Sequence, residues 1–266
     1  MENNNIIGIH LHFCKLKPDN SFYTNQCENF GDYVFIDCTS RNKECAQDLS
    51  PFYLGPAVGP DGARASTVET LFQCGKVYPC HDDNGAPNKE FFEWRDKMYG
   101  KEIGELSKEE LRHPQRSLGY EASDCLYFPW YDEKSGKYIP LDYITSRKKV
   151  YIPNYARLVS KTETFKRLKK LVDEGKKIAL ADFDCYNYYS RSAMMKKYES
   201  YINKCKKNHV EPSLCLDDFL NIKTMKDVVN CPFTPAGHSF IIKALLQGDL
   251  EVTDSGELID HAGLLD

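Results

Sequence analysis

The sequence contains no Cys-x-x-Cys pair, and its 11 cysteines are odd in number and irregularly spaced. Structural zinc sites usually use such pairs and disulfide frameworks use an even number, so we expect neither. No run approaches the roughly 20 apolar residues of a membrane span. The N-terminus lacks the basic segment and unbroken apolar run of a signal peptide. These absences predict a protein of the reducing cytoplasm with free thiols and no membrane partner.

A basic excess is also missing, since 35 Lys and Arg stand against 39 Asp and Glu, a net charge of −4. Proteins that wrap a duplex contact many phosphates with Lys and Arg, so extensive nucleic-acid binding is not indicated. A nucleotide, or a single modified nucleotide in a polymer, stays open as a ligand. The 12% aromatic residues suit either an aromatic-rich core or stacking on planar ligands.

The apolar periodicity predicts more helix than strand. No internal repeat or linker is apparent, so we predict one α+β domain over residues 1–266, mainly helical with a few short strands. Strands are expected at 6–13, 32–38 and 177–183. Helices are expected from Ser66 to Pro79, and at 88–99, 162–174, 191–207, 215–229 and 237–247.

The strongest chemical signal is the segment 66–78, STVETLFQCGKVY. On a helix, Glu69, Gln73 and Lys76 would return to one side, which aligns a carboxylate, an amide and an amine. A Gly- and Pro-rich loop precedes them and could wrap closely around a ligand. Ser66-x-x-Glu69 also has the pattern of a capping box, so Glu69 could serve the helix alone. Glu–Lys pairs are, moreover, common on helix surfaces.

Short motifs around this segment resemble the NADAR family, named for its association with NAD and ADP-ribose chemistry. The resemblance runs patchily from about residue 49 to 248 and is most specific at 66–78. Its longer branch, found with DNA ADP-ribosyltransferase toxins, is the more similar. The bacterial relative implicated in riboflavin metabolism shares the 66–78 helix. The motifs are Leu49-Ser50-Pro51-Phe52, Leu54-Gly55-Pro56, Val68-Glu69, Phe72-Gln73, Lys76-Val77-Tyr78-Pro79 with His81, Glu93-Trp94-Arg95, Phe183-Asp184 with Tyr186, and Gly237-His238-Ser239-Phe240.

The resemblance implies hydrolysis of the N-glycosidic bond between ADP-ribose and guanine, in nucleic acid or nucleotide, without metal or cofactor. It also implies a functional link to an ADP-ribosyltransferase whose modification the enzyme reverses. Such cleavage leaves positive charge on the ribose C1, which Glu69 and either Asp182 or Asp184 could stabilise. Lys76 could attack C1 and form an imine with the opened sugar, or could hold a diphosphate or ribose hydroxyl.

Further residues of the motifs are expected to contact substrate, and each has a structural alternative. Asp182 and Asp184 could form a turn, Trp94 could belong to the core, and Arg95 could be a solvated charge. His238 could meet an anion at a helix start, or be a half-buried histidine. The expected contacts are Gln73, Ser50, Phe52, Leu54, Gly55, Tyr78, His81, Trp94, Arg95, Tyr186 and His238.

Two rival functions remain beside the glycohydrolase. One is an N-glycosidase that acts on a phosphorylated ribosyl-pyrimidine intermediate of riboflavin synthesis. The other is a non-catalytic ADP-ribose-binding module. Basic residues at 147–149, 161–177 and 191–207 could follow phosphates or simply face water. Cys74 is expected to be buried packing and not a nucleophile.

Overall fold

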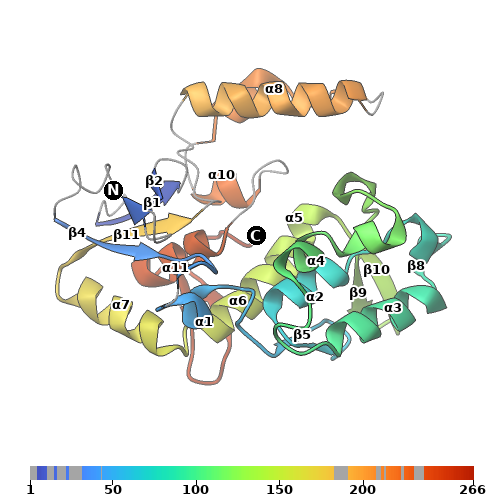
Figure 1. Cartoon of the computed structure of the whole chain (residues 1–266), viewed down its shortest axis with the longest axis horizontal. Coiled ribbons are helices and arrows are strands. Elements are labelled where there is room, and N and C mark those ends of the chain that lie inside the picture. Colours follow the sequence, from blue (N-terminus) through green and yellow to red (C-terminus); the bar gives the residue numbers. More distant parts are fainter. Residues whose placement is uncertain are drawn as a thin grey trace. The chain divides into compact units, whose positions relative to one another are not determined.

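The computed structural model describes residues 5–10, 15–16, 22–23, 32–42, 44–182, 191–207, 211–212, 214–222, 225–230 and 237–266. The chain divides into two compact units, each assembled from separated segments. Unit 1 comprises residues 1–38, 168–251 and 260–266, and unit 2 comprises 39–167 and 252–259. Both contain helices and short strands, so the predicted mixture of α and β structure is confirmed (Figure 1). The prediction of a single domain over 1–266 stays a prediction.

Unit 1 is organised around a three-stranded parallel sheet with the order β1-β11-β4. Its central strand is buried from Ile178 to Asp182, as expected for a strand with neighbours on both sides and cover on both faces. Helix α11 packs against β1 and β11 (Figure 1). The bounds are β1 (Ile6–His10), β4 (Tyr33–Asp37), β11 (Lys177–Asp182) and α11 (His238–Gln247).

A second cluster of unit 1 joins α8 (Arg191–Lys207) to α9 (Leu216–Leu220) through Met194 and Phe219. The chain continues into α10 (Met225–Val229). The expectation of one helix over 215–229 is therefore wrong. Helix α9 ends at Leu220 with Asn221 as its C-cap, and Asn is a poor residue for a helix interior.

Unit 2 is built on α2 (Val68–Cys74), against which α3 (Lys89–Tyr99) and α4 (Lys108–Arg112) pack (Figure 1). The Tyr99 hydroxyl donates a hydrogen bond of 2.9 Å to the carbonyl of Leu71 and thereby ties α3 to α2. An antiparallel hairpin and a run of helical turns complete the unit. These are β9 (Phe128–Asp132), β10 (Lys137–Leu141), α5 (Tyr143–Ser146), the π-helix Arg147–Tyr151 and α6 (Ile152–Val159).

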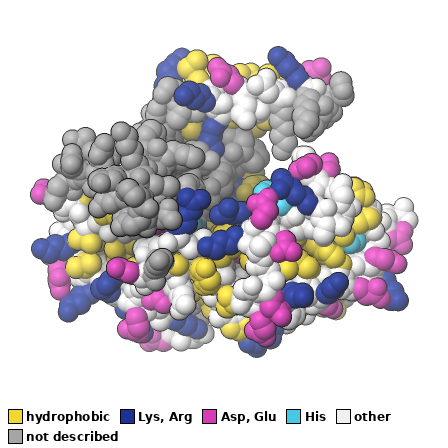
Figure 2. Space-filling view, viewed as in Figure 1, with side chains coloured by type: hydrophobic (Ala, Val, Ile, Leu, Met, Phe, Trp, Pro, Cys, Tyr) yellow, Lys and Arg dark blue, Asp and Glu magenta, His cyan; other side chains and the backbone are white. Residues whose placement is uncertain are grey.

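The remaining described elements are short, apart from α7. They are α1 (Ala46–Leu49), α7 (Glu163–Asp173), the 3-10 helices Pro79–His81, Pro114–Leu118 and Ala122–Asp124, and the strands β2 (Lys15–Leu16), β3 (Phe22–Tyr23), β5 (Ala57–Val58), β6 (Arg64–Ala65), β7 (Asp82–Asp83), β8 (Ala86–Pro87), β12 (Leu250–Val252) and β13 (Leu258–Asp260). Within the described ranges, no helix is long and apolar enough to cross a membrane. Lys and Arg side chains lie among Asp and Glu on the face drawn in Figure 2.

Most predicted elements are confirmed within the one or two residues by which helix and strand ends normally vary. Helix α3 begins after Asn88, whose side chain accepts a hydrogen bond from the Phe91 amide, and it ends at Gly100 as expected. The predicted strand 6–13 is described only as far as His10. The helices expected at 162–174, 191–207 and 237–247 and the strands at 32–38 and 177–183 correspond to α7, α8, α11, β4 and β11.

The predicted capping box of α2 is wrong. Thr67 is the N-cap, and its hydroxyl accepts a hydrogen bond of 3.1 Å from the Thr70 amide. Helix α2 also ends earlier than expected, at Cys74 with Gly75 as C-cap, so Lys76 lies beyond the helix. Gly75 has a packing reason, since a Cβ there would lie 2.6 Å from the Phe128 ring. Because Thr67 and not Ser66 caps the helix, the Glu69 carboxylate does not serve as the partner in a capping box with Ser66.

Candidate functional site

The loop 50–55 is anchored on the first turn of α2. The amide of Glu69 donates to the carbonyl of Pro51 at 3.1 Å, and the amide of Val68 donates to that of Leu54 at 2.9 Å. These bonds satisfy two amides that a helix start leaves without intrahelical partners. Ser50 is fully buried, and its hydroxyl accepts from the Phe52 amide at 3.4 Å. The loop and the helix of the sequence motif thus form one local structure.

Gly55 holds this loop close to the backbone that leads into α2. A Cβ at this position would lie 1.8 Å from the carbonyl oxygen of Ser66 and 3.1 Å from the Cα of Thr67. No side chain fits there, because real Cβ atoms do not approach backbone atoms so closely. Leu54 beside it is buried. The structure thus supplies a packing reason for Gly55, while the predicted substrate contacts of Leu54 and Gly55 stay predictions.

Glu69, Gln73 and Lys76 form a continuous chain of hydrogen bonds, here called the polar chain. The amide nitrogen of Gln73 donates to Oε1 of Glu69 at 3.0 Å. The ammonium of Lys76 donates to Oε1 of Gln73 at 2.5 Å. Glu69 is buried, whereas Gln73 and Lys76 are half-buried. The predicted alignment of the three side chains is confirmed, although Lys76 reaches the group from the segment after α2.

One aromatic ring lies beside the ammonium of Lys76, and three further rings pack around that ring. Nζ of Lys76 lies 4.9 Å from the centroid of the Phe72 ring, a cation–π contact. The Phe72 ring stacks on Phe128, with centroids 5.8 Å apart and planes 19° apart. Tyr143 and Tyr151 lie at 6.4 Å and 5.2 Å from Phe72. The amine of Lys76 therefore has an amide oxygen as one neighbour and an aromatic face as another.

Cys74 and Cys125, near the polar chain, both have raised thiol pKa values. Burial, together with the charge of Glu69, raises the pKa of the Cys74 thiol to about 12, and the side chain is fully buried. Burial also raises the pKa of Cys125, although the charge of Lys76 opposes the shift. A nucleophilic cysteine needs a lowered pKa and access to solvent. The prediction that Cys74 is buried is confirmed.

His81 and Trp94 lie together, although they come from different elements. The imidazole is 5.2 Å from the indole and 5.8 Å from the Phe91 ring, both between centroids. Only 3% of His81 is exposed, and its Nδ1 has no hydrogen-bond partner. Burial lowers the pKa of His81, while the charge of Glu90 acts in the opposite direction. The Tyr78 ring, also buried, stacks on Tyr120 at 6.0 Å.

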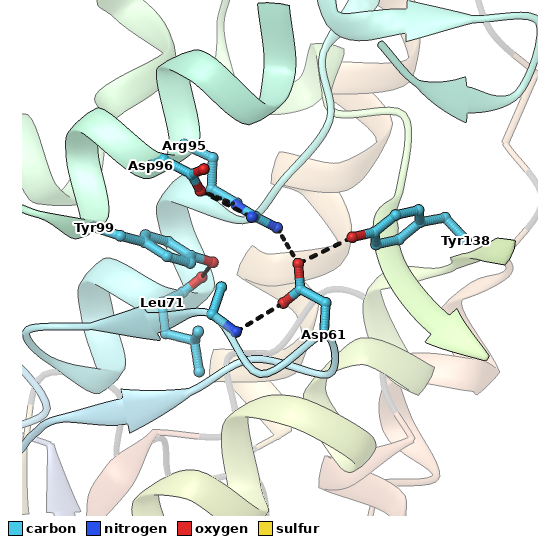
Figure 3. Close-up of polar contacts among 7 residues, drawn as sticks. Asp61, Leu71, Arg95, Asp96, Tyr99 and Tyr138 are labelled. Atoms are coloured by element: carbon cyan, nitrogen blue, oxygen red, sulfur yellow. Dashed lines mark hydrogen bonds and ion pairs between the residues drawn. The ribbon is translucent and has the colours of Figure 1, made fainter. Parts of the chain in front are cut away.

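Arg95 belongs to a buried polar network (Figure 3). Its guanidinium lies 2.6 Å from the carboxylate of Asp61 and 2.8 Å from that of Asp96. The hydroxyl of Tyr138 donates a further hydrogen bond of 3.0 Å to Asp61. Burial would raise the pKa of Asp61, but the hydrogen bond and charge of Arg95 outweigh burial, and the pKa lies below its usual value. Arg95 is therefore not the solvated charge considered from the sequence.

Asp182 and His238 pair within unit 1. Asp182 is the last residue of β11, His238 is the first of α11, and both are buried. Oδ2 of Asp182 lies 3.3 Å from Nδ1 of His238, and no hydrogen bond satisfies that oxygen. Nε2 of His238 lies 2.8 Å from the carbonyl oxygen of Cys38. The side chain of His238 is thus positioned by two partners.

The predicted site residues Asp184 and Tyr186 lie outside the described residues. Phe52 is half-buried, with the guanidinium of Arg112 at 5.3 Å from its ring centroid. Within the ranges that the structure describes, no group of three or more His, Cys, Asp or Glu side chains is arranged to hold a metal ion.

Sequence reasoning missed Asp61, Phe128 and Tyr143. Asp61 lies in a turn between Pro60 and Gly62, where aspartate is common without any partner far along the chain. Its bond to Arg95 joins residues 34 positions apart. A single sequence carries no signal for such a pairing.

Neither a family model, nor a curated protein, nor a solved structure matches this chain. The resemblance to the NADAR family stays an expectation drawn from the sequence motifs.

Proposed function

We propose that the protein is an ADP-ribosyl glycohydrolase that hydrolyses the N-glycosidic bond between ADP-ribose and guanine. The observation that carries the proposal is the polar chain. It holds a carboxylate, an amide and an amine in one hydrogen-bonded line, with bonds of 3.0 Å and 2.5 Å. This is the residue set that the sequence motif associates with ribose chemistry. The carboxylate and the amine are joined through the Gln73 amide, so one local structure offers both a charge stabiliser and a nucleophile.

Glu69 fits the electrostatic demand of the reaction. As the bond to guanine breaks, positive charge develops on C1 and the ring oxygen of the ribose. A carboxylate that the fold already holds in position can stabilise that charge without reorganising. Glu69 is buried, and Gln73 fixes its Oε1. The second carboxylate role predicted for Asp182 or Asp184 stays a prediction.

Lys76 has two candidate roles. As a neutral amine it would attack C1, and the bonding pair to guanine would leave with the base, which takes up a proton. The resulting glycosylamine would open to an imine between Lys76 and the sugar, and water would then release ADP-ribose and regenerate the amine. As an ammonium it would instead hold a phosphate or hydroxyl. In the free protein its Nζ contacts the Gln73 amide oxygen and the Phe72 ring, two groups that a substrate phosphate or hydroxyl would have to join.

The test uses single-stranded DNA that carries ADP-ribose on guanine or on thymine. Release of ADP-ribose is followed by mass spectrometry. We expect turnover of the guanine adduct and not of the thymine adduct. Lys76→Ala and Glu69→Ala are expected to lower the rate by about 1,000-fold, within the range that acid–base and electrostatic groups supply. Lys134→Ala, which removes an exposed lysine from the β9–β10 turn, is the matched control and should retain the rate.

A trapping experiment distinguishes the two candidate roles of Lys76, nucleophile and cationic binding group. Borohydride added during turnover reduces an imine to a stable secondary amine, which adds the mass of the sugar adduct to a peptide containing Lys76. Lys76→Arg keeps the positive charge but cannot form the imine. An inactive Lys76→Arg protein with a trapped wild-type adduct supports the nucleophile. Processing of the phosphorylated ribosyl-pyrimidine in place of either DNA adduct, or binding of ADP-ribose with no turnover, would overturn the proposed function.

A further inference from the structure

One face of the β9–β10 hairpin packs on Phe72, the ring that the Lys76 ammonium contacts. In an antiparallel pair, directly opposed residues point to the same face, and so do alternate residues along each strand. Trp130 faces Ile139, and Phe128 faces Leu141, so these four side chains share one face. Phe128 also stacks on Phe72 at 5.8 Å. The apolar face thus begins beside the polar chain and leads away from it toward Trp130.

The opposite face of the hairpin packs against other parts of unit 2. Tyr131 and Tyr138 point to that side, and their ring centroids lie 5.2 Å apart. Tyr138 packs on Phe92 of α3 at 5.3 Å and bonds Asp61 through its hydroxyl. An isolated hairpin is marginally stable, and these contacts hold it to unit 2. The hairpin is therefore held in place by contacts on the face opposite to Trp130.

Part of this face reaches solvent, since Ile139 is 44% exposed and Trp130 opposite it is half-buried. Tyr143, which follows β10 closely and lies 6.4 Å from the Phe72 ring, is 42% exposed. Large apolar side chains at such exposure are individually ordinary, but a group of them beside aromatic rings indicates a binding surface. We define the stacking surface as Trp130, Ile139 and Tyr143.

An exposed cation borders the stacking surface, since Nζ of Lys149 lies 5.3 Å from the Trp130 ring centroid. The guanidinium of Arg147 lies 4.5 Å from the Tyr143 ring centroid, but Arg147 is buried. In the part of the chain that the structure describes, neither Lys149 nor Lys76 forms an ion pair with a carboxylate. Among the described residues, the Lys149 ammonium beside Trp130 therefore has no carboxylate as a counter-charge.

We propose that the stacking surface, with Lys149, binds a short single-stranded stretch of nucleic acid next to the modified nucleotide. The proposal rests on the proposed function and names its substrate as a polymer. Exposed rings bind bases without regard to sequence, and lysines beside them bind the phosphates. Two residues along a strand span about 7 Å, so Trp130 lies only one or two stacked nucleotides from Phe128. A net charge of −4 also agrees with few phosphate contacts.

Binding is tested first with unmodified oligonucleotides, so that this test does not depend on catalysis. Fluorescence anisotropy of a labelled single strand of about eight nucleotides, a length within the usual site size, gives Kd. Trp130→Ala is expected to weaken binding about 10-fold, the effect of losing one stacked base. Lys149→Ala should weaken binding and lower the slope of log Kd against log salt by about 0.7. DNA and RNA strands are compared in parallel arms.

Matched variants separate local from general effects. Lys134→Ala removes the same charge from the turn of the same hairpin, and Ile103→Ala removes an exposed apolar side chain elsewhere in unit 2. Both should leave Kd unchanged. Equal binding of duplex and single strand, or a Trp130→Ala protein that is folded by circular dichroism and binds as the wild type does, would overturn the proposal. So would an affinity that does not depend on salt.

A second measurement compares polymer and nucleotide substrates. With guanine-ADP-ribosylated oligonucleotide, Trp130→Ala should raise KM about 10-fold and leave kcat unchanged. With the ADP-ribosylated guanine nucleotide, both constants should stay at wild-type values, because that substrate does not reach the stacking surface. If no adduct is turned over but the anisotropy results are as expected, the proposed function is wrong and the assignment of the stacking surface to nucleic-acid binding is retained. If both substrates respond equally to Trp130→Ala, the surface assignment fails instead.

Discussion

Unit 2 contains two polar groups that differ in how completely they are closed. In the network around Asp61, the carboxylate has Arg95, Tyr138 and the Ala63 amide as partners, and the ion-paired side chains are 9% and 12% exposed. In the polar chain, Glu69 is buried but the amine at the other end is half-buried and has no carboxylate partner among the described residues. The charges of the Asp61 network are thus paired with one another, whereas the polar chain ends in the Lys76 amine, which a ligand could contact.

This contrast separates a structural role from a chemical one. Removing one member of a closed buried pair leaves an uncompensated charge in a poorly hydrated place, and stability falls. Removing the half-buried amide or amine of the polar chain leaves atoms that water reaches in part, so stability changes less. If the polar chain serves chemistry, its variants should lose more rate than stability. The Asp61 network should show the reverse.

The largest effect on stability is expected for Arg95→Met. The substitution keeps most of the apolar stem but leaves Asp61 buried and unpaired, so the free energy of unfolding should fall by about 3 kcal/mol. Urea denaturation followed by circular dichroism measures the change. The double variant Arg95→Met with Asp61→Leu should recover part of the loss, because no buried charge then remains.

The same variant decides between the two interpretations of Arg95. Activity per folded molecule should stay close to that of the wild type, since the guanidinium is engaged by Asp61 and Asp96. A stable Arg95→Met protein with a greatly raised KM would instead support the substrate contact that the sequence motif predicts.

Gln73→Met should affect the rate most selectively. Methionine keeps the length of the side chain but cannot accept from Lys76 or donate to Glu69, so both ends of the polar chain lose their orientation. Loss of positioning of this kind costs about 100-fold in rate. We expect kcat to fall by that factor with KM little changed. The free energy of unfolding should fall by about 1–2 kcal/mol, less than for Arg95→Met, because the buried Glu69 carboxylate loses one donor. A fall in stability with unchanged kcat would reverse the comparison between the two groups.

The sequence was informative where local rules act. Asn88 and Gly100 delimit α3, and the apolar run 178–181 predicts a buried strand, because caps and burial periodicity are encoded within a few residues. The side-by-side placement of Glu69 and Gln73 also follows from helical spacing. Helical spacing did not predict the position of Lys76, because the Gly75 cap ends the helix before that residue.

Long-range pairing accounts for what the sequence could not supply. Asp61 and Arg95, Phe72 and Phe128, and the parallel order β1-β11-β4 all join distant segments. Local propensity is blind to such contacts, which depend on how the whole chain packs. Arg95 therefore appears in the sequence as a free charge beside a tryptophan, whereas the fold gives it a buried carboxylate.

His81 offers a smaller, pH-dependent test. Its imidazole is buried like the Arg95 guanidinium, but no ion pair joins it to a carboxylate of the described residues. Burial lowers the pKa of His81 below that of the unfolded chain, so the native state contributes stability above the unfolded pKa of about 6.5. That contribution is lost as pH falls below 6.5 toward the folded pKa. The loss cannot exceed about 1.4 kcal/mol per pH unit.

The temperature of thermal unfolding, measured from pH 7.5 to 5, should therefore decline more steeply for the wild type than for His81→Phe. Parallel curves would mean that His81 is protonated as easily in the native state as in the unfolded chain.

The smallest effect is expected for an exposed ion pair on the same helix as Arg95. Nζ of Lys89 lies 3.1 Å from Glu93, but the two side chains are 82% and 63% exposed. Exposed pairs contribute little, and a lysine four residues before a glutamate is the weaker orientation. Lys89 also places positive charge in the first turn of α3, where the helix dipole disfavours it. Lys89→Ala should therefore change the free energy of unfolding by less than about 0.5 kcal/mol, and in the stabilising direction. Glu90→Ala in the same turn should give an equally small change of opposite sign, because the dipole favours that carboxylate. A loss at Lys89 comparable to that at Arg95 would mean that charge alone, and not its burial, determines how α3 is stabilised.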